Sequence, residues 1–297
     1  MDKIKGAIAV TIGAASFGVL STFVKKAYEK GFTLGEITGV QALYGMIVLF
    51  VLLAIFKIFN ARYFQKYPSK SPKWVILISG ISTGIVSILY YKSIGLIPAS
   101  LAIVLLMQYI WIGQLLEFLI FRSKPSGKQL FGTLVILGAT LLATGVFEYD
   151  LRSISIAGVA YGLSAATAYA SFILVNGRVG NDHPPVQKSA IMVAGACIFI
   201  FILFRPFSIF EKNIFTEIWS YGILLATLGT VLPPVLFAYG IPKTGVPIAS
   251  ILSTVELPVA ICLSFMILHE HVSMLQFVGV ACILLTIVVI NFPRKKN

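Results

Sequence analysis

Charged residues are scarce in this chain of 297 residues. Asp, Glu, Lys and Arg together make up 11% of it, whereas 58% is hydrophobic and the mean hydropathy is +0.94. Soluble domains carry about 25% charged residues, because their surfaces face water. The composition therefore excludes an ordinary soluble fold and predicts an all-α integral membrane protein.

Several chemical signatures are also missing. The three cysteines, Cys197, Cys262 and Cys282, all lie in apolar runs, so the sequence offers no disulfide framework. It contains no G-x-x-x-x-G-K-[ST] phosphate loop, and the "HEH" at 269–271 lacks the H-E-x-x-H spacing of a zinc site. No nucleophile, base and orienting group can be assembled from the sequence. We therefore expect no metal, no cofactor and no enzymatic activity.

Long apolar runs dominate the chain instead. Each spans about 20 residues and, at about 1.5 Å per residue, can cross a hydrocarbon core of about 30 Å. The runs lie at 4–24, 35–57, 74–95, 98–121, 128–147, 156–177, 187–204, 217–240, 247–268 and 273–292. The first run shows no small-residue cleavage site, so we interpret it as a retained span. The sequence thus predicts ten transmembrane helices.

The basic excess, a net charge of +12, follows the predicted topology. With a cytoplasmic N-terminus, sixteen of the 23 Lys and Arg residues fall in inner segments and seven in outer ones. Cytoplasmic loops carry the Lys and Arg excess, so both termini are predicted to be cytoplasmic. We expect a plasma membrane, which in a bacterium is the inner membrane. Membrane lipids are the expected partners, nucleic acid is not, and a homodimer and a lipid-binding patch at 292–297 stay open.

The two halves of the chain resemble each other. SGKQLFG (126–132) and SMLQFVG (273–279) share Ser-x-x-Gln-x-x-Gly at a separation of 147 residues. KGAIAVTIGAASFG (5–18) can be laid over AGVAYGLSAATAYA (157–170). Because each half holds an odd number of predicted spans, the copies must have opposite orientations in the membrane. We predict two inverted five-helix repeats, residues 1–150 and 151–297, around a central site with alternating access.

An acidic residue interrupts the ninth run, in STVELPVAI. An ionised carboxylate at mid-span costs about 2.5–3.5 kcal/mol. Glu256 lies about 13 Å into its span, near the midplane. Pro258 cannot donate a hydrogen bond to the Thr254 carbonyl, so we expect a kink, a free acceptor and a hinge. The carboxylate either lines a transport cavity, pairing with a cationic substrate or taking up a proton, or is protonated and merely bonded to a neighbouring helix.

Further amides and aromatic residues are candidates for the cavity. The hairpins 90–108 and 238–256 overlay so that Gln108 meets Glu256 and Tyr91 meets Tyr239. For the tyrosines near span ends, an anchoring role at the membrane interface is the alternative. The predicted cavity residues are Gln41, Tyr44, Tyr91, Gln108, Trp111, Tyr161, Tyr169, Asn176, Tyr239 and Glu256. For Glu117 we expect an interfacial ion pair with Arg122 or Lys124.

The predicted cavity limits the class of ligand. Its aromatic and weakly polar lining suits amino acids, amphiphilic metabolites or organic cations. A phosphorylated substrate fits poorly, because no predicted span carries Lys or Arg at its midplane. A lipid-carrier flippase is a further alternative, and it would need a cavity open sideways between helices.

The segment ILSTVELPVAICLSFMILHEHVSMLQFVGVACIL (251–284) resembles the second-repeat signature of the EamA-type transporters of the drug/metabolite transporter superfamily. Its matching positions are Glu256, Pro258, Glu270, Ser273, Gln276 and Gly279. The sequence departs from the family where Leu257 separates Glu256 from Pro258, and where Gln41 and Arg122 replace a common Arg and Glu. The resemblance covers nearly the whole chain and implies a secondary carrier that exports small metabolites such as amino acids, with proton coupling as a hypothesis.

Overall fold

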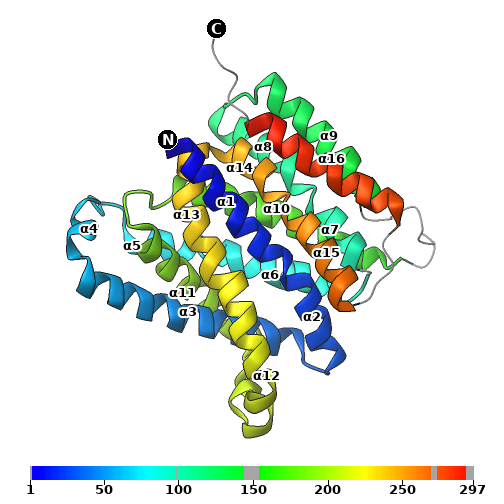
Figure 1. The fold of residues 1–297 in the computed structure, drawn as a ribbon. Helices are drawn as coiled ribbons and strands as arrows, with labels where there is room; N and C mark the ends of the chain where they lie inside the picture. The colour runs from blue at the N-terminus through cyan, green and yellow to red at the C-terminus, as the bar shows by residue number, and fades with distance from the viewer. Residues whose placement is uncertain (1, 98, 144–153, 269–272, 292–297) are drawn as a thin grey trace.

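The structure is a computed structural model that describes residues 2–97, 99–143, 154–268 and 273–291. All the regular secondary structure of these residues is helical, and the helices pack into a bundle (Figure 1). The expectation of an all-α protein is confirmed.

The helices before residue 144 form the first half of the bundle. They are α1 (Asp2–Gly18), α2 (Leu20–Glu29), α3 (Leu34–Phe59), α4 (Ala61–Gln65), α5 (Lys73–Ser79), α6 (Ile81–Ile94), α7 (Ala99–Leu106), α8 (Tyr109–Phe121) and α9 (Gly127–Ala143).

The helices after residue 155 form the second half. They are α10 (Ile156–Arg178), α11 (Pro185–Phe204), η3 (Phe207–Phe210), α12 (Lys212–Leu225), the π-helical η4 (Ala226–Val231), α13 (Leu232–Thr244), α14 (Val246–Ser253), α15 (Glu256–Leu268) and α16 (Met274–Asn291).

Several neighbouring helices continue one another as longer segments. Within the described residues, eight segments are long and apolar enough to cross a membrane. They are Asp2–Glu29, Leu34–Phe59, Lys73–Ile94, Leu101–Phe121, Ile156–Arg178, Pro185–Phe204, Glu217–Thr244 and Val246–Ile267. Two shorter apolar helices, Gly127–Ala143 and Met274–Thr286, occupy the predicted runs 128–147 and 273–292. The chain is therefore a multi-pass membrane protein.

Helix capping explains part of the repeated Ser-x-x-Gln-x-x-Gly pattern. The Ser126 N–H donates to Gln129 Oε1 at 2.7 Å, and the Gln129 N–H donates to Ser126 Oγ at 3.4 Å. Ser273 and Gln276 make the same exchange at 2.8 and 3.4 Å. Each pair is a capping box, which satisfies two backbone donors at a helix start. The motif therefore fixes where α9 and α16 begin.

The two halves of the chain are interleaved in the bundle. The most extensive helix packing joins α1 with α13, α6 with α10, α3 with α11, and α9 with α16. Glycine permits the close crossing of α11: a Cβ added at Gly80 would collide with the Met192 carbonyl, and one added at Gly195 with the Leu77 carbonyl. Small residues at such crossings let helix backbones approach each other.

Two spanning segments are interrupted at corresponding places. α7 ends at Leu106 and α8 begins at Tyr109, whereas α14 ends at Ser253 and α15 begins at Glu256. Both pairs of positions are 147 residues apart, the same separation as the capping motifs. Interrupted helices at matching places in two halves are typical of substrate sites in secondary transporters.

Candidate functional site

Glu256 is the first residue of α15 and follows the second interruption directly. Its side chain is 4% exposed, and Tyr169 of α10 donates a hydrogen bond from Oη to Glu256 Oε2 at 3.3 Å. Among the described residues the structure gives Glu256 no ion-pair partner. The start of a helix carries a partial positive charge, so the backbone of α15 favours a negative group at this position.

Aromatic rings surround the carboxylate. The centroid of the buried Tyr109 ring lies 4.6 Å from that of Tyr169, and Tyr109 Oη donates to the Ser250 carbonyl at 3.1 Å. Tyr109 is the first residue of α8, so the two interrupted segments bring their corresponding positions to the same tyrosine, Tyr169. The interruptions therefore form one site.

A further tyrosine of α6 completes this site. Tyr90 is buried and lies close enough to Glu256 for electrostatic interaction, and its hydroxyl has no hydrogen-bond partner in the described part of the chain. A buried hydroxyl without a partner costs about 1–3 kcal/mol, so it favours an additional polar group here. We call Glu256, Tyr90, Tyr109 and Tyr169 the Glu256 cluster.

A second polar chain joins three helical segments. Tyr91 Oη donates to Gln41 Oε1 at 2.9 Å, and Gln41 Nε2 donates to Thr230 Oγ1 at 3.0 Å. These side chains are buried and come from α6, α3 and η4. The structure thus brings together two predicted site residues, Gln41 and Tyr91, with a threonine that the sequence analysis did not single out.

Two of the predicted tyrosines lie beside lysines. Lys92 Nζ is 4.9 Å from the centroid of the Tyr161 ring, and Lys243 Nζ is 3.5 Å from that of Tyr239. Both rings are only partly buried. These cation–π contacts do not involve a member of the Glu256 cluster.

Tyr44 and Asn176 make contacts of a different kind. The Tyr44 ring packs edge-on against Trp219 of α12, with centroids 5.3 Å apart. Asn176 is fully buried, and its backbone carbonyl accepts a hydrogen bond from Lys188 Nζ at 2.7 Å. Lys188 thereby binds the last turn of α10, where a cation opposes the negative end of the helix. This contact of Asn176 stabilises a helix end.

The expected positions of Gln108 and Trp111 differ from the observed ones. Trp111 is 42% exposed and donates from Nε1 to Gln108 Oε1 at 2.9 Å, so the two side chains do share a face. That face also carries the exposed Leu115 and points out of the bundle. The residue that corresponds to Glu256 at the first interruption is Tyr109, since each is the first residue of its helix. Gln108 lies one residue earlier, and a shift of one residue rotates a helical position by about 100°.

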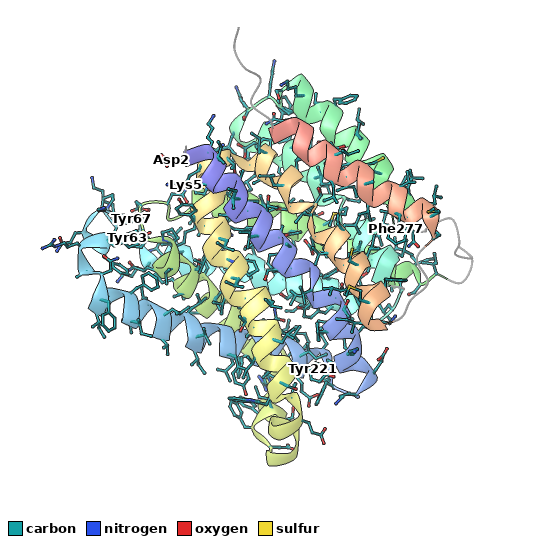
Figure 2. All side chains as sticks on the ribbon, in the orientation of Figure 1. Asp2, Lys5, Tyr63, Tyr67, Tyr221 and Phe277 are labelled. Carbon is teal, nitrogen blue, oxygen red and sulfur yellow. The ribbon has the colours of Figure 1, made fainter. Side chains whose placement is uncertain are left out.

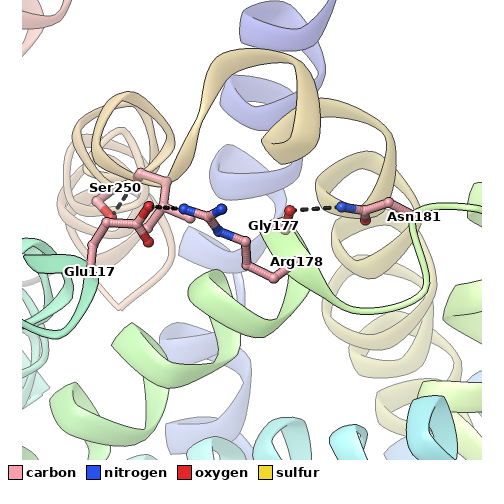
Figure 3. Close-up of polar contacts among 6 residues, drawn as sticks. Glu117, Gly177, Arg178, Asn181 and Ser250 are labelled. Carbon is pink, nitrogen blue, oxygen red and sulfur yellow. Dashed lines mark hydrogen bonds and ion pairs between the residues drawn. The ribbon is translucent and has the colours of Figure 1, made fainter. Parts of the chain in front are cut away.

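The expected partners of Glu117 are also wrong. Arg178 of α10 forms the ion pair with Glu117, in place of Arg122 or Lys124 (Figure 3). Glu117 is buried, whereas the Arg178 side chain is 45% exposed. The pair was missed because its members are 61 residues apart in sequence and meet only through the packing of α8 on α10.

The interruption near Pro258 differs in detail from the prediction. The helix breaks at Thr254 and Val255, so Pro258 lies in the first turn of α15, where its missing N–H has no helical partner to lose. The Thr254 carbonyl is not a free acceptor, since the Leu257 N–H donates to it at 3.1 Å. That part of the prediction is wrong.

A pocket of about 850 Å³ opens at one end of the bundle, where α2 and α6 end and α3 begins. Charged residues of both signs line it: Lys25, Glu29, Glu36, Lys92 and Arg205. The Glu36 carboxylate already has hydrogen-bond partners within the protein. It caps α3 at Thr33 and accepts a hydrogen bond from Ser208 Oγ at 2.8 Å. The pocket is large enough for a small metabolite.

Metal-binding residues do not gather at this site. In the described part of the chain no group of three or more His, Cys, Asp or Glu side chains could hold a metal ion. The "HEH" at 269–271 lies outside the described residues.

Comparison with known families decides the classification. The model of the EamA-like transporter family matches residues 4–145 and matches again at residues 156–292. The chain belongs to the EamA-like transporter family. Its members are membrane transporters, so the sequence resemblance noted above is confirmed.

Relatives in this family include characterised and uncharacterised transporters. The threonine/homoserine exporter RhtA of Escherichia coli K12 is 25% identical over 249 residues, covering 83% of this chain and 79% of RhtA. The uncharacterised transporter YcbK of Bacillus subtilis is 21% identical over 305 residues, covering 98% and 94%. A solved crystal structure shares the fold, with a TM-score of 0.71, 14% identity and coverage of 98% and 97%.

The geometry gives this EamA-like transporter a specific chemical capacity. A buried carboxylate without a cationic partner can exchange a proton or receive a cationic group, and the adjacent tyrosine faces can hold an ammonium. Of the cluster, sequence reasoning selected Glu256 and Tyr169 for the site. It did not include Tyr109 and Tyr90 in the predicted cavity, although the 147-residue spacing of the capping motifs aligns Tyr109 with Glu256.

Proposed function

We propose that this protein is a secondary-active transporter of the plasma membrane with ten spans and both termini in the cytoplasm. Residues 1–150 and 151–297 form two inverted repeats in this proposal. The interruptions at corresponding places in α7/α8 and α14/α15 support it, as does the pairing of helices between the halves. The distribution of Lys and Arg over the predicted loops, sixteen inside and seven outside, supports the orientation.

The Glu256 cluster is the proposed centre of the alternating-access cavity, with Gln41 and Tyr91 beside it. The observation that carries the proposal is the buried carboxylate at the interruption, which has no ion-pair partner among the described residues, since such a group in a membrane is retained for function. The pocket of about 850 Å³ is the proposed access route from the outer side. The first turn of α15, with Pro258, is the proposed hinge.

Amino acids and related zwitterions are the proposed substrates, and export is the proposed direction. The similarity to RhtA, a threonine/homoserine exporter, supports this class at 25% identity. Glu256 and the tyrosine faces suit the ammonium group of a zwitterion. The ends of the interrupted helices offer backbone N–H groups for its carboxylate.

Purified protein in proteoliposomes tests this function. Liposomes loaded with labelled threonine or homoserine should release the label faster than protein-free liposomes when a pH gradient is imposed. Homoserine phosphate is the matched control and should stay inside the liposomes. The four residues of the Glu256 cluster include no Lys or Arg that could bind its phosphate group. If neither amino acid is released above the protein-free rate, these substrates are ruled out.

An organic-cation carrier is the second candidate, because the same acid and aromatic rings suit a quaternary ammonium ion. Tetraethylammonium should then compete with the labelled substrate and should itself be transported. A thermal-shift screen compares amino acids with organic cations. A ligand that binds the native state raises its apparent stability, so the class that raises the melting temperature is the one that binds.

A further inference from the structure

The connection between α3 and α5 is strongly basic. Residues 57–73 contain no Asp or Glu and five cations. These cations are Lys57, Arg62, Lys66, Lys70 and Lys73, and all five side chains are exposed. We call residues 57–73 the basic loop.

The apolar residues beside the basic loop place it at the membrane surface. Phe59, the last residue of α3, is 84% exposed, and Trp74 in the first turn of α5 is 64% exposed. Exposed aromatic residues at the ends of spanning helices lie where the hydrocarbon meets the lipid head groups. The cations between them are therefore at the level of the lipid phosphates.

The basic loop is held in place by the opposite half of the chain. Asp182, between α10 and α11, accepts hydrogen bonds from the N–H and the Oγ of Ser71, both at 2.6 Å. The Ser69 N–H donates to the Asp182 carbonyl at 2.9 Å, and His183 Nε2 lies 2.9 Å from the Ser71 carbonyl. The Ser69–Ser71 end of the basic loop, which includes Lys70, is therefore anchored to the connection between α10 and α11.

The loop also has structure of its own. The hydroxyls of Tyr63 and Tyr67 lie 3.1 Å apart, and both tyrosines are on the side of the bundle that carries Asp2 and Lys5 (Figure 2). The short helix α4 lies within the basic loop, between Lys57 and Lys73 in sequence, and carries Arg62. An anchored loop backbone loses less entropy on binding than a flexible one, which increases its affinity.

We propose that the basic loop is a binding site for anionic phospholipids, with the lipid phosphates held by Arg62, Lys66 and Lys70. Clusters of about four to eight cations directly beside a spanning helix are typical of such sites. The lipid's acyl chains lie along Phe59 and Trp74. This site requires only that the chain lies in a membrane, so it does not depend on the proposed substrate.

Lipid binding to the purified full-length protein tests the proposal. Binding of phosphatidylglycerol and phosphatidylcholine in neutral detergent is measured by native mass spectrometry and by thermal shift. Phosphatidylglycerol should bind and raise the melting temperature, phosphatidylcholine should not, and added salt should weaken the effect. The triple variant R62Q/K66Q/K70Q should bind phosphatidylglycerol on the order of 100-fold more weakly.

Two control variants separate the site from net charge and from misfolding. R122Q/K124Q/K128Q removes the same charge from exposed positions at the end of α8 and the start of α9 and should bind lipid as the parent does. R62K/K66R/K70R keeps the charge and should also bind as the parent does. The proposal is overturned if the Gln triple variant keeps the parent's affinity, if both neutralised variants lose it equally, or if an acidic peptide stabilises the parent and phosphatidylglycerol does not.

Discussion

Two buried carboxylates in this protein differ in their partners. Glu117 lies near the end of α8 and is paired with Arg178 of α10, a side chain that is 45% exposed (Figure 3). Glu256 lies at an interruption within a span and accepts a hydrogen bond from the neutral Tyr169. Breaking a buried ion pair is costly, because it leaves a charge without compensation. We therefore expect Glu117 to contribute to stability and Glu256 to contribute to transport.

The comparison extends to the repeat. Glu256 corresponds to Tyr109, so the acid occurs at only one of the two interruptions. The backbone interruption is repeated in both halves, whereas the charge is not. The Glu256 cluster therefore carries one carboxylate, although both interruptions contribute to it.

Glu256→Gln should have the largest effect. The substitution keeps the shape of the side chain and removes its charge. Transport driven by a pH gradient should fall by about 10- to 100-fold, which corresponds to the free energy of a hydrogen bond to a charged group. Proteoliposome efflux across a series of pH gradients measures it, with the exposed Glu211→Gln as control. An unchanged pH response of the Glu256 variant would exclude proton coupling through this residue.

Arg178→Gln should have the largest effect on stability. It leaves Glu117 buried without its cation, at a cost of about 3 kcal/mol. Glu117→Gln should cost less, because the partly exposed Arg178 can then be hydrated. Thermal unfolding in detergent compares the two variants, and equal losses would show that the burial of Glu117 does not decide the outcome.

Tyr169→Phe removes the hydroxyl that bonds Glu256 but keeps the ring. We expect a loss of about 1 kcal/mol, or about fivefold in transport rate. Tyr109→Phe is the matched control, because its hydroxyl bonds the Ser250 carbonyl instead. It should destabilise the protein to a similar extent and leave the pH profile of transport unchanged. Identical pH profiles for both variants would contradict a role of Tyr169 through Glu256.

The smallest effect is expected at Asp182, outside the spans. Partial burial opposes its ionisation, but the hydrogen bonds from Ser71 outweigh this and lower the pKa of the Asp182 carboxyl from 3.8 to about 2. Its stabilisation is therefore present above about pH 4 and is lost as the pH falls towards 2. Solvent screening keeps the effect of Asp182→Asn below about 1 kcal/mol.

Thermal unfolding of the parent and the Asp182→Asn variant between pH 6 and pH 2 measures this contribution. The difference between the two proteins should be constant down to about pH 4 and should shrink as the pH falls towards 2. A difference that is as large at pH 2 as at pH 6 would contradict the assigned hydrogen bonds.

How far the sequence could predict the site depends on the range of each interaction. The choice of Glu256 was possible because the cost of a mid-span charge is local to its own helix. Gln108, the predicted counterpart of Glu256, precedes Tyr109 by one residue, because two distant segments can be aligned with a difference of one position, which changes the helix face. Arg178 reaches Glu117, and Tyr90 reaches the Glu256 cluster, only through packing between helices, and no local pattern marks such contacts.

The sequence alone determined that this chain crosses a membrane several times and that its halves are related. Hydrophobic length and the capping residues act within each segment, so they can be read along the chain. Only the tertiary structure decided which helix faces meet, that Glu117 pairs with Arg178, and that Tyr109 and Glu256 share one site. The physical reason is that the mutual rotation and crossing of helices depend on close packing between residues far apart in sequence.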